Sequence, residues 1–300
     1  MRNFIKIVSL VIVVALVATL AVAFTGCNNS TKAQGMDDFP AMIMALNTKA
    51  IDGYVAEEPG AIENCASNKD FTYIHLVNNT TGFKASEEDT AIAVGIKKGS
   101  ALTAQVNRAL ATVSQAERDT MMETAIGYAT GSNVTEGSDD EIEGKVEKSD
   151  EYLFVGLECA YAPFNFTQLD DTNGAVPIYN PNYKRISGYA NGYDVMIAKK
   201  IAEALGRKLI IVKQEWDSLI PSLTAGTIDM IIAGMSPTAD RKLTIDFSDA
   251  YYTSQLVVVV RKDGKYANAK TLDDLKGAKL TAQLGTFHLD ALNAWLEENK

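Results

Sequence analysis

The sequence lacks the residue patterns that mark most catalytic and metal-binding sites. Its 300 residues include two histidines, His75 and His288, in unrelated contexts, and three cysteines without metal-ligand spacing. It has no P-loop, no glycine fingerprint for dinucleotides, no zinc-protease motif and no G-x-S-x-G nucleophile motif. We therefore expect neither a cofactor nor a bound metal.

Basic residues are scarce relative to acidic ones, with 28 Lys and Arg against 38 Asp and Glu and a formal net charge of −10. This balance argues against a nucleic-acid partner. The shares of hydrophobic residues, 47%, and of charged residues, 22%, are ordinary for a globular protein. A chain of 300 residues is too long for one small domain and favours two lobes.

A long apolar run lies at the N-terminus, over residues 7–24, after the basic residues Arg2 and Lys6. Together with Cys27, this pattern is typical of a bacterial lipoprotein signal over residues 1–27, with Cys27 as the lipid-attachment residue. Phe24 and Thr25 depart from the usual Leu-Ala/Ser pair, and the alternative is an uncleaved signal anchor. In both cases we expect the rest of the chain outside the cytoplasm. The anchor would hold it on the extracytoplasmic face of the cell membrane, as on a Gram-positive surface.

Strand and helix patterns alternate from Tyr152 onward. One helical pattern, for example, has Ile197, Ile201 and Leu205 on a single face. The alternation predicts an α/β fold with a parallel, doubly wound sheet. The expected strands are 152–157, 208–212, 228–232, 254–261 and 279–283, and the expected helices are 194–205, 218–224 and 287–299.

Residues 37–130 contain a second set of such patterns. A helix is expected from Asp37, with Pro40 in its first turn, and strands are expected at 53–56, 72–77 and 91–96. The next segment, 131–150, is rich in Gly, Ser, Asp and Glu and has few large apolar residues. We therefore expect a solvated acidic linker there.

The stretch 228–241 combines a buried strand with a polar turn. Its strand ends in Gly234, Met235 and Ser236, and the fixed cation Arg241 follows. The carboxyl ends of strands in open α/β sheets bind small polar ligands, and backbone N–H groups with a guanidinium suit a carboxylate. The alternative is an ordinary turn with a solvated arginine.

Several motifs, in their order and spacing, resemble the polar amino-acid-binding proteins of ABC importers, which are type II periplasmic binding proteins. They are Tyr161-Ala162-Pro163-Phe164, Gly192-Tyr193-Asp194, Trp216 to Pro221, and the stretch 228–241. The resemblance implies two lobes, each with a doubly wound sheet, joined by a two-strand hinge. It also implies a monomeric, non-enzymatic receptor that delivers a free amino acid to ABC permease subunits.

The order of the similar parts is reversed relative to the family. Residues 152–300 resemble the first part of the family's domain, and residues 37–126 resemble its later part. We therefore predict a circular permutation, which is feasible because domain termini lie close together at the surface. The alternative is two truncated pieces of different proteins, which would leave half a sheet uncovered. The predicted segments are 28–92 and 256–300 for lobe 2, 93–130 and 151–255 for lobe 1, and 131–150 for the linker, with the hinge near 90–94 and 255–259.

The resemblance also implies a binding site for the two charged ends of an amino acid. Arg241 matches the family arginine that grips the carboxylate. Glu57 matches the acidic position that meets the ammonium, although the family residue is usually Asp; the alternative for Glu57 is a solvated acid at a strand end. Further donors or acceptors are expected from Gly234, Met235, Ser236, Thr286 and Phe287.

For the ligand's side chain, Tyr161 and Trp216 match the two positions that sandwich it. Phe164 accompanies them, although it and the other two aromatics could be core residues. Glu158 matches the position that meets the distal polar end of the ligand, and Gln283 lies opposite. This set favours Lys, Arg or ornithine, while glutamine or histidine remains an alternative.

Two other functional classes remain open at this point. The same fold could carry an enzyme, such as a dehydratase of cyclic acids, or a sensor without a permease. Cys65 and Cys159 could pair or stay free, and we expect buried free thiols.

Overall fold

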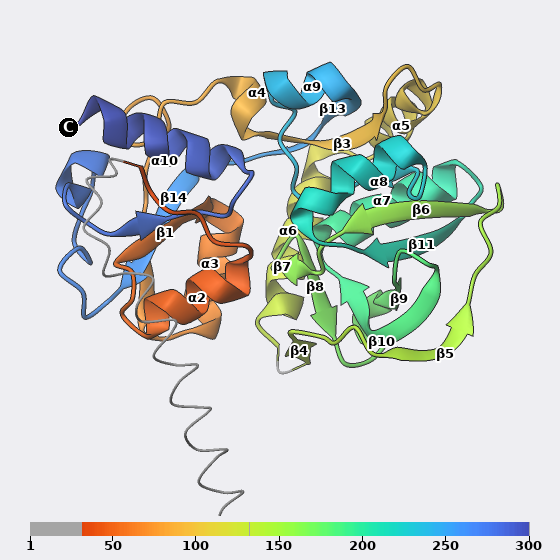
Figure 1. The fold of residues 1–300 in the computed structure, drawn as a ribbon, viewed down its shortest axis with the longest axis horizontal. Helices are drawn as coiled ribbons and strands as arrows, with labels where there is room; N and C mark the ends of the chain where they lie inside the picture. Colours follow the sequence, from red (N-terminus) through yellow and green to blue (C-terminus); the bar gives the residue numbers. More distant parts are fainter. Residues whose placement is uncertain (1–31, 132, 300) are drawn as a thin grey trace, which may run out of the picture. The chain divides into compact units, whose positions relative to one another are not determined.

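The computed structural model describes residues 32–131 and 133–299, and the predicted signal segment with Cys27 lies outside these residues. Figure 1 shows that the strands form two separate sheets. We call them the smaller sheet and the larger sheet. The smaller sheet has the order β15 (Leu280–Thr281), β1 (Gly53–Glu57), β14 (Leu256–Arg261) and β2 (Phe71–Ile74).

The smaller sheet joins segments from opposite ends of the sequence. Strand β1 pairs antiparallel with β14 along its whole length and parallel with β15. Because side chains alternate across a strand, Val257 and Val259 enter one hydrophobic cluster with Tyr54, whereas Val258 and Val260 enter another. The sheet is thus buried on both faces, which explains the uninterrupted apolar run of β14.

The larger sheet has a parallel centre and antiparallel margins. Adjacent strands run parallel from β12 to β6, β11 and β9, and β3 runs antiparallel to both β12 and β13. The α/β expectation is therefore confirmed. The order is β13 (Ile245–Thr253), β3 (Ala91–Lys97), β12 (Met230–Ile231), β6 (Tyr152–Leu157), β11 (Lys208–Lys213), β9 (Val176–Tyr179), β10 (Lys184–Asn191), β8 (Asn165–Gln168) and β4 (Val134–Thr135), with β5 (Glu141–Lys145) on β10 and β7 (Ala160–Tyr161) on β8.

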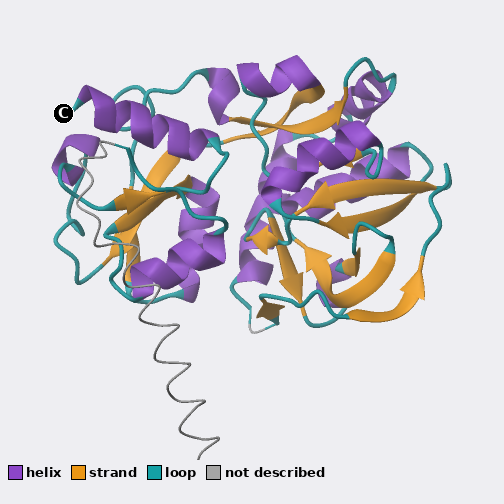
Figure 2. Cartoon of the chain, viewed as in Figure 1, coloured by secondary structure: helices purple, strands orange, loops and turns teal. Residues whose placement is uncertain are grey.

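Helices flank each sheet (Figure 2). Helices α2 (Phe39–Asn47), α3 (Glu58–Ser67) and α10 (Phe287–Glu298) pack on the smaller sheet, whereas α5 (Leu102–Ala111), α7 (Tyr193–Ala204) and α8 (Leu219–Ala225) pack on the larger one. Helix α6 (Gln115–Ala129) contacts both α3 and α7. The short helices α4 (Glu87–Thr90) and α9 (Ala239–Thr244) precede β3 and β13. No helix within residues 32–131 or 133–299 has the length and apolar content needed to cross a membrane.

The chain passes between the sheets near the predicted hinge. Ser254 and Gln255 connect β13 to β14, and the backbone N–H of Ser254 donates to the carbonyl of Thr90 at 3.1 Å. The expected hinge stretches, 90–94 and 255–259, lie mostly inside β3 and β14, so the connecting residues begin slightly earlier than expected.

Two segments contain strands that the sequence did not reveal. The segment 131–150, predicted as a solvated acidic linker, is largely exposed, and it contains two strands, since β4 pairs with β8 and β5 pairs with β10. All five residues of β5 are exposed, and an exposed edge strand carries no apolar face that a pattern could show. The region 158–193, where the sequence patterns placed no strand or helix, contains β7 to β10.

The two cysteines in the described part of the chain are unpaired thiols, as expected, although Cys65 is only half-buried. Burial raises the pKa of Cys65 to about 11 and also raises the pKa of Cys159. Both thiols are therefore protonated at neutral pH and are poor nucleophiles.

Gly192 fixes the position of the loop that carries Tyr161. Its φ of 120° lies in the region that favours glycine, and it precedes the first turn of α7. The N–H groups of Tyr193 and Asp194 donate to the carbonyls of Pro163 and Phe164 at 3.0 and 2.7 Å. The start of α7 thereby holds the backbone that follows Tyr161.

Replacing Gly192 with alanine should destabilise the protein by at least about 2 kcal/mol, because the new methyl carbon would lie 2.4 Å from the Phe164 oxygen. The matched control is Gly127→Ala, inside α6, where a methyl group meets nothing within 4 Å. That change should stabilise the protein by about 0.5–1 kcal/mol. Urea unfolding of both variants measures the difference, and equal stabilities would contradict the role of Gly192.

Candidate functional site

A narrow pocket brings together residues from elements of both sheets. Its open volume is about 10 Å³, close to the minimum that holds one water molecule. Most of the predicted site residues line it, whereas Glu158, Phe164 and Met235 do not. The lining consists of Phe39, Glu57, Tyr161, Trp216, Ala233, Gly234, Ser236, Arg241, Gln283, Thr286, Phe287 and His288.

Arg241 is held in the pocket by backbone carbonyls and an aromatic ring. Its Nη1 donates to the carbonyl of Ser236 at 2.8 Å and its Nη2 to that of Gly285 at 2.9 Å. The guanidinium carbon lies 5.1 Å from the centre of the Trp216 ring. Burial lowers the pKa of Arg241 to about 10, while the charges of Asp290 and Glu57 oppose that shift. The side chain therefore remains a cation at neutral pH.

Helix α9 places Arg241 by a local capping arrangement. The side chain of Thr238, at the N-cap, accepts from the backbone N–H of Arg241 at 3.5 Å. The preceding strand is β12, so Arg241 follows the carboxyl end of a parallel strand. This is the placement that the 228–241 stretch predicted.

Glu57 is a buried carboxylate with two side-chain partners. Its Oε1 lies 2.8 Å from Nε2 of His288, and its Oε2 accepts a hydrogen bond from the Tyr161 hydroxyl. Glu57 ends β1 of the smaller sheet, whereas Tyr161 belongs to β7 of the larger sheet. This carboxylate therefore bridges elements of the two sheets.

His288 is a pocket residue that sequence reasoning missed. It is buried in the first turn of α10, and its Nδ1 has no hydrogen-bond partner in the described part of the chain. The sequence feature that could have pointed to His288 is its position next to Thr286 and Phe287, both of which were expected to contact a ligand. An isolated histidine is not informative until the fold brings a carboxylate beside it.

Glu158 and Gln283 form a second polar pair behind the pocket. Gln283 lines the pocket, and its Nε2 donates to Oε1 of Glu158 at 2.8 Å. The Oε2 atom of Glu158 is buried without a partner within residues 32–131 and 133–299. Burial raises the pKa of Glu158 to about 8. At neutral pH this carboxyl group is therefore largely protonated.

The aromatic residues are arranged differently from the expected sandwich. The Tyr161 ring stacks on Phe39, with centroids 3.9 Å apart and an interplanar angle of 11°. It also stacks on Phe164 at 5.0 Å, while Trp216 lies against Arg241. Phe164 is fully buried against Tyr193 and Tyr252, so it packs as a core residue.

Asp194 stabilises the turn at residues 233–236 through a hydrogen-bond network. This carboxylate accepts from Asn165 Nδ2 at 2.8 Å and from the Tyr251 hydroxyl at 2.7 Å, and a backbone hydrogen bond from Gly234 also stabilises its charged form. Burial nevertheless raises its pKa to about 6. Met235 is buried beside this network, and its carbonyl accepts from Ala93.

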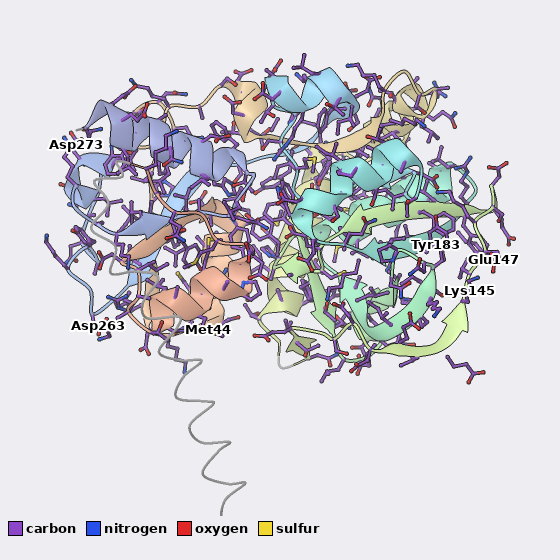
Figure 3. All side chains as sticks on the ribbon, in the orientation of Figure 1. Met44, Lys145, Glu147, Tyr183, Asp263 and Asp273 are labelled. Carbon is purple, nitrogen blue, oxygen red and sulfur yellow. The ribbon has the colours of Figure 1, made fainter. Side chains whose placement is uncertain are left out.

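Many charges elsewhere are exposed and contribute little to stability. The pair Lys145–Glu147, labelled in Figure 3, is typical, with a separation of 2.7 Å and both side chains more than half exposed. Within the described residues, no group of three or more His, Cys, Asp or Glu side chains is arranged to hold a metal ion.

Residues 153–299 match the family model of bacterial extracellular solute-binding proteins, family 3. Over these residues the chain is similar to that family, whose matched relatives are named as amino-acid-binding proteins.

Among its relatives is the arginine-binding extracellular protein ArtP of Bacillus subtilis, 31% identical over 141 residues, which cover 47% of each chain. Another is the L-cystine-binding protein TcyJ of Escherichia coli, 32% identical over 175 residues, which cover 58% of this chain and 57% of TcyJ. The chain thus matches only about half the length of these relatives. A solved structure, the arginine-bound form of domain 1 from TmArgBP, is 31% identical over 49% of this chain and 93% of its own, with a TM-score of 0.27.

The raised pKa of Glu158 predicts that the stability of the folded protein depends on pH. Its pKa is raised by burial, so between about pH 5 and 8 the unfolded chain loses a proton that the folded chain keeps. This contribution to the free energy of unfolding falls by up to about 1.4 kcal/mol per pH unit in that window. Glu158→Gln has no proton to lose at this position. Its free energy of unfolding, measured relative to that of wild type, should therefore rise by up to about 4 kcal/mol from pH 5 to pH 8. Urea unfolding at both pH values measures this, and parallel pH profiles would contradict it.

Proposed function

We propose that this chain is an extracytoplasmic receptor that binds one free polar amino acid and delivers it to the permease of an ABC importer. The observation that carries the proposal is that a half-buried cation, Arg241, and a buried carboxylate, Glu57, line one pocket between elements of different sheets. A zwitterion presents the two complementary charges at a short fixed separation.

The ligand's carboxylate would bind at Arg241 and at the start of α10. The guanidinium has five N–H donors, of which the observed carbonyl contacts use only part. Thr286 is the N-cap of α10 but makes no side-chain capping bond, because its hydroxyl donates to the Gln283 carbonyl at 2.7 Å. The free N–H groups of this first turn favour an anion.

The ligand's ammonium would bind at Glu57. A carboxylate in a buried site needs a cation or strong donors, and Glu57 now receives them from His288 and Tyr161. An ammonium group would add to these donors or replace one of them. The other sequence-predicted lining residues, Gly234, Ser236, Gln283 and Phe287, surround the same space.

For the ligand's identity, we propose a cationic amino acid first, namely arginine, lysine or ornithine. Two relatives are named as arginine-binding, and Glu158 with Gln283 offers oxygen acceptors for a guanidinium or ammonium. Glutamine or histidine is the second candidate, since a protonated Glu158 beside Gln283 also suits a neutral amide or imidazole. Other relatives are named as histidine-binding.

We also propose that the chain is circularly permuted and that its lobes follow the segments given by the sequence. The contacts at residues 33–36 support this. Met36 pairs with Gln283, the N–H of Ala33 donates to Asn293 of α10, and the Thr281 hydroxyl donates to the carbonyl of Gln34. Residues near 33 therefore lie beside the segment that precedes them in the family order. Ligand binding would draw the lobes together by a hinge movement.

The proposed lipid anchor at Cys27 would restrict how the receptor docks. The segment from Asn28 to Gly35 spans at most ~26 Å at ~3.3 Å per residue. It leads into the smaller sheet, that is, into lobe 2, whereas the family order leads the anchor into lobe 1. We propose a monomer on the cell membrane that meets its permease in this constrained orientation.

Titration calorimetry against the twenty standard amino acids and ornithine tests the proposed function. We expect one or a few polar ligands to bind with a dissociation constant near micromolar, which is about −8 kcal/mol. The ligand should be recovered chemically unaltered. Absence of heat with every ligand would refute the amino-acid receptor, and conversion of the ligand would favour an enzyme.

Two variants separate the proposed roles within the site. Arg241→Ala should weaken the affinity for every ligand by at least about 100-fold, because it removes two or more charge-assisted hydrogen bonds. Arg241→Lys keeps the charge but loses the bidentate geometry, so it should retain part of the affinity. Trp216→Ala should mainly alter the ranking among ligands. An equal loss across the panel for Trp216→Ala would contradict its role at the ligand's side chain.

A further inference from the structure

Phe39 occupies a position between two cavities. It lines the narrow pocket described above and also a second cavity of about 500 Å³. The second cavity is lined mainly by α2, the end of α3, the end of α6 and the segments around β4 and β7. The other residues of the second lining, such as Ile43 and Ala160, do not line the pocket.

The ring of Phe39 is held firmly in this position. Phe39 begins α2, whose N-cap Asp38 accepts from the backbone N–H of Ala41 at 2.8 Å. Only 3% of Phe39 is exposed. Its ring stacks on Tyr161 and makes edge-to-face contacts with Tyr54 at 6.3 Å and with His288 at 6.5 Å. Backbone and ring contacts together leave little freedom for rotation.

The second cavity has a distinct chemical character. Two carboxylates, Glu63 and Glu136, line it together with the amides of Asn64 and Asn68. No Lys, Arg or His from residues 32–131 and 133–299 belongs to its lining. Glu63 is buried, its Oε1 accepts from the Ser67 hydroxyl at 2.6 Å, and burial raises its pKa. A cation arriving beside such a carboxyl group would favour its charged form.

We propose that Phe39 is the residue that limits ligand length, because its ring closes the amino-acid pocket against a second, acidic cavity suited to a cationic extension of the ligand's side chain. This inference rests on the proposed function, since it takes Tyr161 as a contact of the ligand's side chain. The Phe39 ring, stacked on Tyr161, lies in the path that a longer ligand side chain would take. Removing the ring joins the two spaces and admits amino acids that carry an amine beyond the normal side-chain length.

The test compares each free amino acid with an analogue lengthened at the end of its side chain. The first pair is L-lysine and Nε-glycyl-L-lysine, and the second is L-glutamine and Nδ-(2-aminoethyl)-L-glutamine. Wild type should bind the free member of its preferred pair at least tenfold more tightly than the long one. Phe39→Ala should change the ratio of the two dissociation constants by at least tenfold in favour of the long analogue. Calorimetry measures both constants.

A neutral analogue tests the acidic lining. Nε-acetyl-L-lysine has nearly the shape of Nε-glycyl-L-lysine but lacks the terminal ammonium. With Phe39→Ala it should gain less affinity than the glycyl compound does, and the difference should shrink in high salt. An equal gain for both compounds would overturn the assignment of a cationic extension.

The matched control is Ile43→Ala, which enlarges the second cavity but keeps the Phe39 ring between the two cavities. Its ratio of dissociation constants should equal that of wild type. An unchanged ratio in Phe39→Ala, or the same shift in Ile43→Ala, would overturn the role of Phe39. If thermal unfolding shows that Phe39→Ala is not folded, Phe39→Val carries the test, with a smaller shift of about threefold expected. Failure of wild type to bind any free amino acid would instead refute the proposed function itself.

Discussion

The pocket depends on the rule that a buried charge must be matched by partners. Glu57 is the clearest case, because its carboxylate receives the Tyr161 hydroxyl from the larger sheet and His288 from α10 on the smaller sheet. Arg241 is matched in turn by the carbonyls of Ser236 and Gly285, again from both sides. Leaving the buried Glu57 carboxylate unpaired would cost several kcal/mol. The same requirement that holds the two sets of elements together thus creates a site for a zwitterion.

The scaffold around the pocket is arranged to keep these groups in place. The start of α7 holds the backbone after Tyr161, Asp194 supports the turn that carries Gly234 and Ser236, and α10 presents an uncapped first turn. Segments from opposite ends of the sequence, β1 and β14 with β15, share one sheet. Since contacts rather than chain order define such a sheet, a permuted order is compatible with the arrangement.

Much of the local structure was predictable, for reasons that can be assigned to particular segments. Strand β6 was expected at 152–157 and is found there, and the expected helix 194–205 corresponds to α7 at Tyr193–Ala204. In both segments, the apolar residues of the buried face recur at a regular spacing along the sequence. Strands β5 and β7 to β10 were missed because they are short, polar or exposed, so their patterns resemble loops. Strands β5 and β8 each pair with β10 across intervening segments, whereas β9 and β10 are consecutive strands.

By itself, the sequence determined the α/β class, the strand that leads to Arg241 and the set of residues from which the pocket is mostly built. The α/β class and this strand follow from local periodicity, whereas the residue set follows from the resemblance of its motifs to a known family. Only the tertiary structure decided that His288 faces Glu57, that Phe39 stacks on Tyr161, and that Glu158 lies behind Gln283. Such pairs join residues more than a hundred positions apart, and no local pattern encodes which side chains meet once two sheets are packed together.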